Sequence, residues 1–176
     1  TGVQTCALPI LVSAEMLSNE SGKILMVSPT RPLTEQHLHS FQRFLMIEEM
    51  VMFSGSMKPA KRVEEWKKAR IVFSTPQTIK NDLEKERYDI SDVSLLIVDE
   101  AHRSVGDYAY TGILSRYEGH VLGLTASPGG DSKKINEVIE NLDVDNIEVR
   151  TSGDEDVKDH VRGLKSNGGE RNFTRI

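Results

Sequence analysis

Two adjacent carboxylates, Asp99 and Glu100, follow directly on the apolar run 95–98. An apolar run without alternation predicts a strand that is buried on both faces, as in a parallel sheet. Functional groups in such sheets lie just beyond the carboxyl ends of the strands, which is where both side chains fall. There Asp99 could hold a hydrated Mg²⁺ that bridges nucleotide phosphates, and Glu100 could orient and deprotonate an attacking water. The alternative is that the pair only caps the next helix, since acidic side chains favour helix N-termini.

Four other apolar runs also end in small polar or proline-containing clusters. Parallel strands bring their carboxyl ends to one edge of a sheet, so the five clusters are expected to form a continuous rim. Each cluster alone could be ordinary turn or helix-cap chemistry, whereas their order and spacing together indicate a functional edge. The clusters are Pro29-Thr30-Arg31, Ser54-Gly55, Thr75-Pro76-Gln77, Asp99-Glu100-Ala101-His102 and Thr125-Ala126-Ser127.

The elements that must position these clusters alternate along the chain. An alternation of strand and helix predicts an α/β fold with a parallel sheet and helices on both faces. The predicted strands are 23–28, 50–53, 71–73, 95–98, 121–124 and 147–149, and the predicted helices are 11–19, 33–44, 59–68, 75–84, 108–117 and 133–142.

Composition limits the classes of protein that the chain can belong to. The 176 residues suit one domain with a tail, and the net charge of −5 gives no overall signature of nucleic-acid binding. Any nucleic-acid site must therefore be a local patch. No apolar run approaches the length of a membrane span, so no membrane partner is expected. Cys6 is the only cysteine, which excludes an internal disulfide and fits a reducing compartment.

The two ends of the chain differ in character from the middle. Residues 1–10, TGVQTCALPI, resemble the in-frame translation of a sequencing-library adapter, and we interpret them as a non-native scar. From residue 151 onward glycines interrupt charged and polar residues, which predicts a linker or truncated tail without packed elements. The expected domain is therefore 11–150.

Several polar residues have a plain structural interpretation. His37 and His39 have no metal-ligand companions and are expected to be ordinary surface or boundary histidines. Trp66 is expected to be a packing residue. A basic cluster is interrupted by two glutamates and is interpreted as a solvated helix face. The cluster comprises Lys58, Lys61, Arg62, Lys67, Lys68 and Arg70.

The clusters and the segments around them resemble a known family. The chain resembles the first RecA-like domain, a P-loop NTPase fold, of superfamily-two DEAH-box helicases, and more narrowly the branch of archaeal Hef and Fanconi anaemia group M DNA translocases. This branch acts on forked or branched DNA in repair and replication-fork processing. The segments that carry the match are STPQTIKNDL (74–83), LLIVDEAHRSVGDYAY (95–110), LGLTASPGG (122–130) and INEVIENLDVDNIEVRTSGDEDV (135–157).

The resemblance implies a role for each rim residue. Asp99 would bind the Mg²⁺ of Mg-ATP through water, and Glu100 would be the general base. His102, Thr125 and Ser127 would couple the nucleotide state to the DNA-binding face. Sequence-independent contacts to a DNA backbone suit hydroxyls, backbone N–H groups and one guanidinium. The residues expected to make them are Pro29, Thr30, Arg31, Ser54, Gly55, Thr75, Pro76 and Gln77.

The chain departs from the family pattern in two places. The phosphate-binding loop of the family, which ends in Gly-Lys-Thr, should stand immediately before Leu11, where the adapter-like residues stand instead. A second RecA-like domain, which would supply an arginine finger, is also missing from the sequence. We therefore expect negligible ATP hydrolysis by this polypeptide, although its parent would be an ATPase.

Two other functions stay open at this stage. The chain could be a non-catalytic nucleic-acid-binding module that kept the fold and lost the loop. It could also be an RNA-directed superfamily-two helicase, although those relatives usually have cysteine where Ala101 stands. For the DNA helicase interpretation, the resemblance implies a cytoplasmic, DNA-associated protein of a prokaryote, and of an archaeon in particular.

Overall fold

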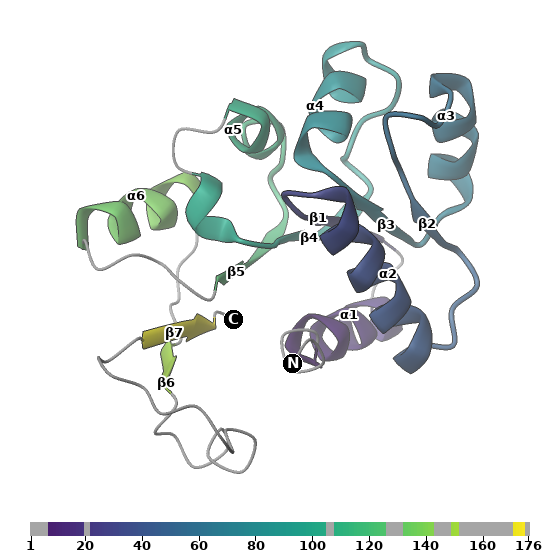
Figure 1. Cartoon of the computed structure of the whole chain (residues 1–176). Coiled ribbons are helices and arrows are strands. Elements are labelled where there is room, and N and C mark those ends of the chain that lie inside the picture. The colour runs from purple at the N-terminus through teal and green to yellow at the C-terminus, as the bar shows by residue number, and fades with distance from the viewer. Residues whose placement is uncertain are drawn as a thin grey trace.

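The computed structural model describes residues 7–19, 22–104, 108–125, 132–142, 149–151 and 171–174. Strands and helices alternate within these residues, which confirms the α/β class (Figure 1). The strands are β1 (Lys23–Val27), β2 (Met50–Met52), β3 (Ile71–Ser74), β4 (Val93–Val98), β5 (His120–Thr125), β6 (Val149–Thr151) and β7 (Arg171–Thr174). The helices are α1 (Ala7–Asn19), α2 (Arg31–Phe44), α3 (Pro59–Lys68), α4 (Pro76–Glu84), α5 (Tyr108–Leu114) and α6 (Ser132–Leu142), with a 3₁₀ helix at Ala101–Ser104.

Five strands form a parallel sheet in the order β2-β3-β1-β4-β5. Val27, the last residue of β1, lies opposite Ser74 of β3 and Val98 of β4, which are also the last residues of their strands. The carboxyl ends therefore meet at one edge, as the sequence predicts. β7 extends the sheet by pairing antiparallel with β5, and β6 pairs antiparallel with β7.

Alternate residues of each strand feed two separate hydrophobic cores, because successive side chains point to opposite faces. Leu25 and Val27 pack on the face that is covered by α3, α4, α5 and α6. Ile24 and Met26 pack on the face that is covered by α1 and α2. Helices on both faces confirm the predicted layering (Figure 1).

The two ends of the chain differ from the sequence-based expectations. Helix α1 begins at Ala7, so four of the adapter-like residues lie within the fold, and Ile10 is only 6% exposed. Alanine and leucine favour the helix, and Pro9 is tolerated in its first turn. Within the residues expected to form a linker or truncated tail, Arg171–Thr174 forms β7 on the free edge of β5. The interpretations of 1–10 as a scar and of 151–176 as a linker stay predictions.

Gly22 stands where the chain enters β1, at the foot of the sheet. A Cβ at this position would lie 2.6 Å from Cβ of Ser94 in β4. The glycine is therefore explained by the close approach of two strands.

None of the described helices is long and apolar enough to cross a membrane.

Candidate functional site

The rim of the sheet brings together most of the predicted site residues. In spatial order it carries the clusters that begin at Ser54, Thr75, Pro29, Asp99 and Thr125, because these follow β2, β3, β1, β4 and β5. Ser127 lies outside the described residues. Two halves can be distinguished: a β4–β5 half with the carboxylates, and a β2–β3–β1 half with hydroxyls, glycine and proline.

Asp99 is held at the end of β4 by backbone and side-chain contacts. Its N–H donates to the carbonyl of Val27 across 2.9 Å, and its Oδ2 lies 2.8 Å from Nε2 of His37 in α2. His37 is 4% exposed, so the expectation of an ordinary boundary histidine is wrong. The hydroxyl of Tyr110 donates to the Asp99 carbonyl across 3.4 Å. Asp99 is thus fixed from three elements, β1, α2 and α5.

Glu100 adopts a backbone conformation that is rare for its residue type, with φ of 52°. Left-handed conformations of non-glycine residues are strained and cluster at functional sites. The Oε2 atom of Glu100 lies 3.1 Å from Nδ1 of His102, and both side chains remain about one-third exposed, at 32% and 31%. The carboxylate is thereby aimed along the rim and remains accessible.

His102 connects the tips of two strands. Its Nδ1 atom lies 2.8 Å from Oγ1 of Thr125, which is the last residue of β5, and also faces Glu100. Both carboxylates of the acidic pair therefore contact histidines, which is not expected if they only cap the following 3₁₀ helix. A chain of polar contacts therefore runs from Glu100 through His102 to Thr125 and joins the tips of β4 and β5.

The donor set fits a magnesium ion that is held mainly by a nucleotide. The described residues contain no group of three or more His, Cys, Asp or Glu that could hold a metal. Mg²⁺ usually keeps several waters and binds one or two carboxylates together with substrate phosphates, so a cage of protein ligands is not required. The Asp99 carboxylate, which uses one oxygen for His37, has further lone pairs for such water-mediated binding.

The Pro29-Thr30-Arg31 cluster forms the start of α2. Thr30 is the N-cap, with its hydroxyl oxygen 3.5 Å from the N–H of Leu33, and its carbonyl accepts from Thr34 N–H at 3.0 Å. Thr30 and Arg31 are exposed. A cation and accessible polar groups at a helix N-terminus suit a phosphate.

The clusters after β2 and β3 present accessible polar groups next to the Pro29-Thr30-Arg31 cluster. Ser54 Oγ and Ser56 Oγ lie 2.9 Å apart, and a Cβ at Gly55 would meet no atom within 4 Å. Thr75 Oγ1 lies 3.1 Å from Thr78 Oγ1, and exposed Gln77 donates to Asn81. Pro76, the third residue of that cluster, is buried in the first turn of α4, so only its neighbours present side chains at the rim.

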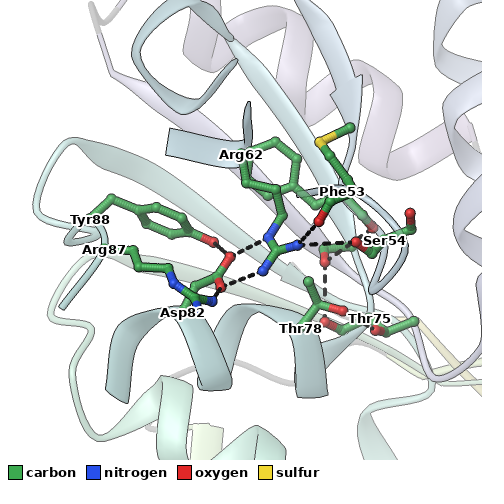
Figure 2. Close-up of polar contacts among 10 residues, drawn as sticks. Phe53, Ser54, Arg62, Thr75, Thr78, Asp82, Arg87 and Tyr88 are labelled. Atoms are coloured by element: carbon green, nitrogen blue, oxygen red, sulfur yellow. Dashed lines mark hydrogen bonds and ion pairs between the residues drawn. The ribbon is translucent and has the colours of Figure 1, made fainter. Parts of the chain in front are cut away.

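A buried network of charges behind this half was not anticipated from the sequence (Figure 2). Arg62 is 5% exposed and pairs with Asp82, which is 0% exposed. The interpretation of the whole basic cluster as a solvated face is therefore wrong for Arg62, although Lys58, Lys61, Lys67 and Lys68 are exposed. Trp66 is a packing residue as expected, because it is 5% exposed and stacks on Tyr88 with ring centroids 4.3 Å apart.

One kind of signal in the sequence, a polar residue on the inner face of a helix, could have identified the three missed residues. Arg62 lies one turn before Trp66 on the inner face of α3, and Asp82 follows Ile79 by three positions on the inner face of α4. His37 likewise shares a helical face with Thr34 and Phe41, all buried. A polar residue on an apolar face requires a buried partner.

Comparisons with known proteins agree with this geometry. Residues 4–135 match the family described as DEAD/DEAH box helicase. A putative ATP-dependent RNA helicase of Methanocaldococcus jannaschii is 43% identical over 169 residues, which cover 94% of this chain and 22% of that protein. The ATP-dependent DNA helicase mph1 of Sclerotinia sclerotiorum is 39% identical over 146 residues, which cover 79% of this chain and 12% of that protein.

Solved structures show the same fold. The crystal structure of the Pyrococcus furiosus Hef helicase domain superposes with a TM-score of 0.87 and 41% identity, covering 94% of this chain and 36% of that chain. A DEAD box protein from Methanococcus jannaschii superposes with a TM-score of 0.60 and 19% identity, covering 69% of this chain and 35% of that chain, which supports the fold alone.

The fold and the rim place the chain among RecA-like domains with an acidic strand tip. The chain belongs to the DEAD/DEAH box helicase family, since the family match covers most of its length. It spans about a fifth of the length of the M. jannaschii relative and about an eighth of the fungal one.

Proposed function

We propose that the chain is the first RecA-like domain of an ATP-dependent DNA helicase or translocase that acts on forked or branched DNA. The observation that carries the proposal is the single rim, on which the acidic pair and the exposed polar clusters follow five neighbouring parallel strands. Family membership and the Hef-like fold support it. The proposed setting is DNA-associated, in the cytoplasm of a prokaryote and specifically of an archaeon.

The β4–β5 half would carry the chemistry on ATP. When bound, Mg²⁺ would neutralise charge that develops on the transferred phosphoryl group. Asp99, fixed by His37, would hold the ion through water. Glu100 would orient a water and accept its proton. His102, which contacts both Glu100 and Thr125, would couple the nucleotide state at β4 to the tip of β5. Ser127 belongs to the same proposed coupling cluster.

The β2–β3–β1 half would hold the backbone of a nucleic-acid strand. Exposed hydroxyls, helix N-termini and a guanidinium recognise phosphates without reading base identity. Sequence-independent binding is what a translocase requires, and its affinity should fall as salt rises. The proposed contacts are Pro29, Thr30, Arg31, Ser54, Gly55, Thr75, Pro76 and Gln77, with Pro76, which has no N–H to donate, contributing by fixing the first turn of α4.

We propose that this polypeptide alone hydrolyses ATP negligibly. The sequence contains no Gly-Lys-Thr, and an arginine finger from a second RecA-like domain can contribute about 10³–10⁵ in rate. A malachite-green assay with branched DNA should show no release of phosphate above that of a Glu100→Gln variant. Clear turnover that the variant abolishes would contradict the proposal of inactivity and would support the role of Glu100.

An RNA-directed function is the second candidate, because one relative is described as a putative RNA helicase. Fluorescence anisotropy with a single-stranded DNA and an RNA of the same sequence separates the two. DNA binding that equals or exceeds RNA binding agrees with the DNA proposal, whereas a clear preference for RNA contradicts it. Binding to either strand without any ATPase activity, even when the Gly-Lys-Thr loop and second domain are supplied, would indicate a non-catalytic module.

A further inference from the structure

The strongest polar cluster of the described residues lies behind the rim, between α3 and α4 (Figure 2). Arg62 donates from Nε to Oδ2 of Asp82 at 2.6 Å and from Nη2 to Oδ1 at 2.7 Å. This is a bidentate guanidinium–carboxylate pair, the geometry that fixes both partners best. Because Asp82 is fully buried, solvent does not compete for the pair.

Two further groups complete the coordination of Asp82. Arg87 donates to Oδ1, and the hydroxyl of Tyr88 donates to Oδ2 at 3.0 Å. Burial alone would raise the pKa of Asp82, but the hydrogen bonds from Arg62, Arg87 and Tyr88 lower the pKa below its ordinary 3.8. The hydrogen bond to Asp82 correspondingly raises the pKa of Arg62, against the opposite effect of burial. Both partners therefore remain charged at neutral pH.

The remaining arm of Arg62 points to the loop between β2 and α3. Its Nη1 atom donates to the carbonyl of Ser54 at 3.3 Å and also to the carbonyl of Met57. The N–H of Met57 in turn donates to the Ser54 carbonyl at 3.0 Å. The guanidinium therefore closes the turn that contains Ser54 and Gly55.

Asp82 belongs to the helix that begins at the neighbouring cluster. Thr75 and Gln77 stand at the N-terminus of α4, and Asp82 lies in the last turns of the same short helix. The strand tips also contact directly, since Ser74 Oγ donates to the Phe53 carbonyl at 3.5 Å. One ion pair thus joins the loop after β2 to the helix after β3.

We propose that Arg62 and Asp82 are positioning residues that set the spacing between the Ser54–Gly55 turn and the N-terminus of α4, so that both can contact phosphates of one strand. The inference rests on the proposed nucleic-acid function of the rim. The pair does not touch the strand itself, because both side chains are buried. The rings of Phe53, Trp66 and Tyr88 pack against one another, and the Tyr88 hydroxyl ties this aromatic group to Asp82.

The chemistry of the pair favours positioning over simple stabilisation. Buried ion pairs add little net stability compared with apolar residues of the same volume, but they specify geometry in some proteins. An apolar residue at position 62 could fill the space, yet it could not hold the Ser54 and Met57 carbonyls. The planar five-donor fork of arginine can satisfy the carboxylate and the loop at once, and lysine cannot.

Two variants of the full chain test the inference: Arg62→Lys, which keeps the charge and removes the fork, and Asp82→Asn. The control is Lys61→Gln, an exposed neighbour on α3. Affinity for a fluorescent single-stranded DNA is measured against KCl concentration, well below the melting temperature of each variant. We expect Arg62→Lys and Asp82→Asn to bind about tenfold more weakly, with a salt slope shallower by about 0.7 for each phosphate that is no longer bound.

A purely structural role would give a different pattern. Melting temperatures that fall while affinity and salt slope stay at the values of the unaltered chain would overturn the inference. Weaker affinity with an unchanged slope in Arg62→Lys would also overturn it, since the variant would then bind as many phosphates as the unaltered chain.

Amide hydrogen exchange keeps the test independent of the proposed function. Both variants should raise exchange in 54–58 and 75–79 together, whereas Lys61→Gln should raise neither. A rise in only one segment contradicts the linkage between the two. If the unaltered chain binds no DNA, the proposed function fails, and the linkage of the two segments is decided by the exchange result.

Discussion

The two halves of the rim are built in opposite ways. Behind the β2–β3–β1 half, Asp82 is fully buried and accepts hydrogen bonds from three residues, and Arg62 donates to a loop as well as to the carboxylate. In the β4–β5 half, Glu100 is 32% exposed, contacts the ring of His102 and adopts a left-handed backbone. The first half is preorganised by its own contacts, whereas the second leaves its functional groups accessible to a ligand.

This difference shows where stability and function can be separated. Removing a buried contact whose partners all lie inside the fold should lower the free energy of unfolding strongly. Removing an exposed group that is available to a ligand should change that free energy little. Variants of both kinds of contact test this contrast.

The largest effect is expected from Asp82→Ala. Removing the acceptor leaves the buried Arg62 guanidinium without its carboxylate, which should lower the free energy of unfolding by about 3–5 kcal/mol. Urea denaturation measures it. Asp92→Ala is the matched control, because its pair with Lys23 lies at the surface with Asp92 47% exposed, and should change stability by less than about 1 kcal/mol. Equal losses in the free energy of unfolding for Asp82→Ala and Asp92→Ala would contradict the expected difference between the buried and the exposed ion pair.

Low pH should lower the stability of the folded chain through the same carboxylate, Asp82. The pKa of Asp82 is below its ordinary 3.8 in the folded chain, so its ionised form favours folding above that pH. This contribution is lost as pH falls from about 3.8 through the lower folded pKa. The stability difference between the unaltered chain and Asp82→Asn should therefore shrink in this window. A difference that is constant from neutral pH to the acid limit of the folded state would be evidence against the shifted pKa.

A smaller effect is expected from relieving backbone strain. Glu86 and Glu100 both have positive φ, at 50° and 52°. Glycine removes the left-handed penalty of about 1–2 kcal/mol but adds up to about 1 kcal/mol of unfolded-state entropy. Glu86→Gly and Glu100→Gly should therefore each change the free energy of unfolding, measured in urea, by less than about 2 kcal/mol, in the stabilising direction. A large destabilisation by Glu100→Gly alone would show that its His102 contact is structural.

The smallest effect on stability is expected from Gly55→Ala. A Cβ there meets no atom within 4 Å, so the free energy of unfolding should change by less than about 0.5 kcal/mol in thermal melts. If phosphate approaches the backbone at this point, DNA affinity measured by anisotropy should nevertheless fall. Unchanged affinity would place the strand away from Gly55, and the exposed Lys61→Gln serves again as the control.

Much of the fold could be predicted because the apolar runs are continuous and each ends in a polar cluster. Parallel pairing then brings Thr30, Thr75 and Glu100 to one edge without knowledge of any side-chain contact. The limits of elements were less certain: α2 begins at Arg31, two residues before the expected start, because Pro32 fits a first helical turn.

The side-chain network could not be predicted to the same degree. His37 meets Asp99 across 62 positions of sequence, and Arg62 meets Asp82 across 20. Such pairs depend on which way each helix face turns after the sheet has formed. A periodic pattern assigns a residue to the inner face, but it does not choose its partner among the groups buried there.

Gly22 lies at the end of the sheet opposite the rim, at a position that tolerates no larger side chain. A single added methyl group would force β1 and β4 apart at their entry, since Ser94 already occupies that space. About 16 Å of strand separates this point from the rim. Strands that diverge at one end tilt at the other, so Thr30 and Asp99 would change their separation. A substitution at the base of the sheet would thus alter the geometry of the rim without changing any residue of the rim.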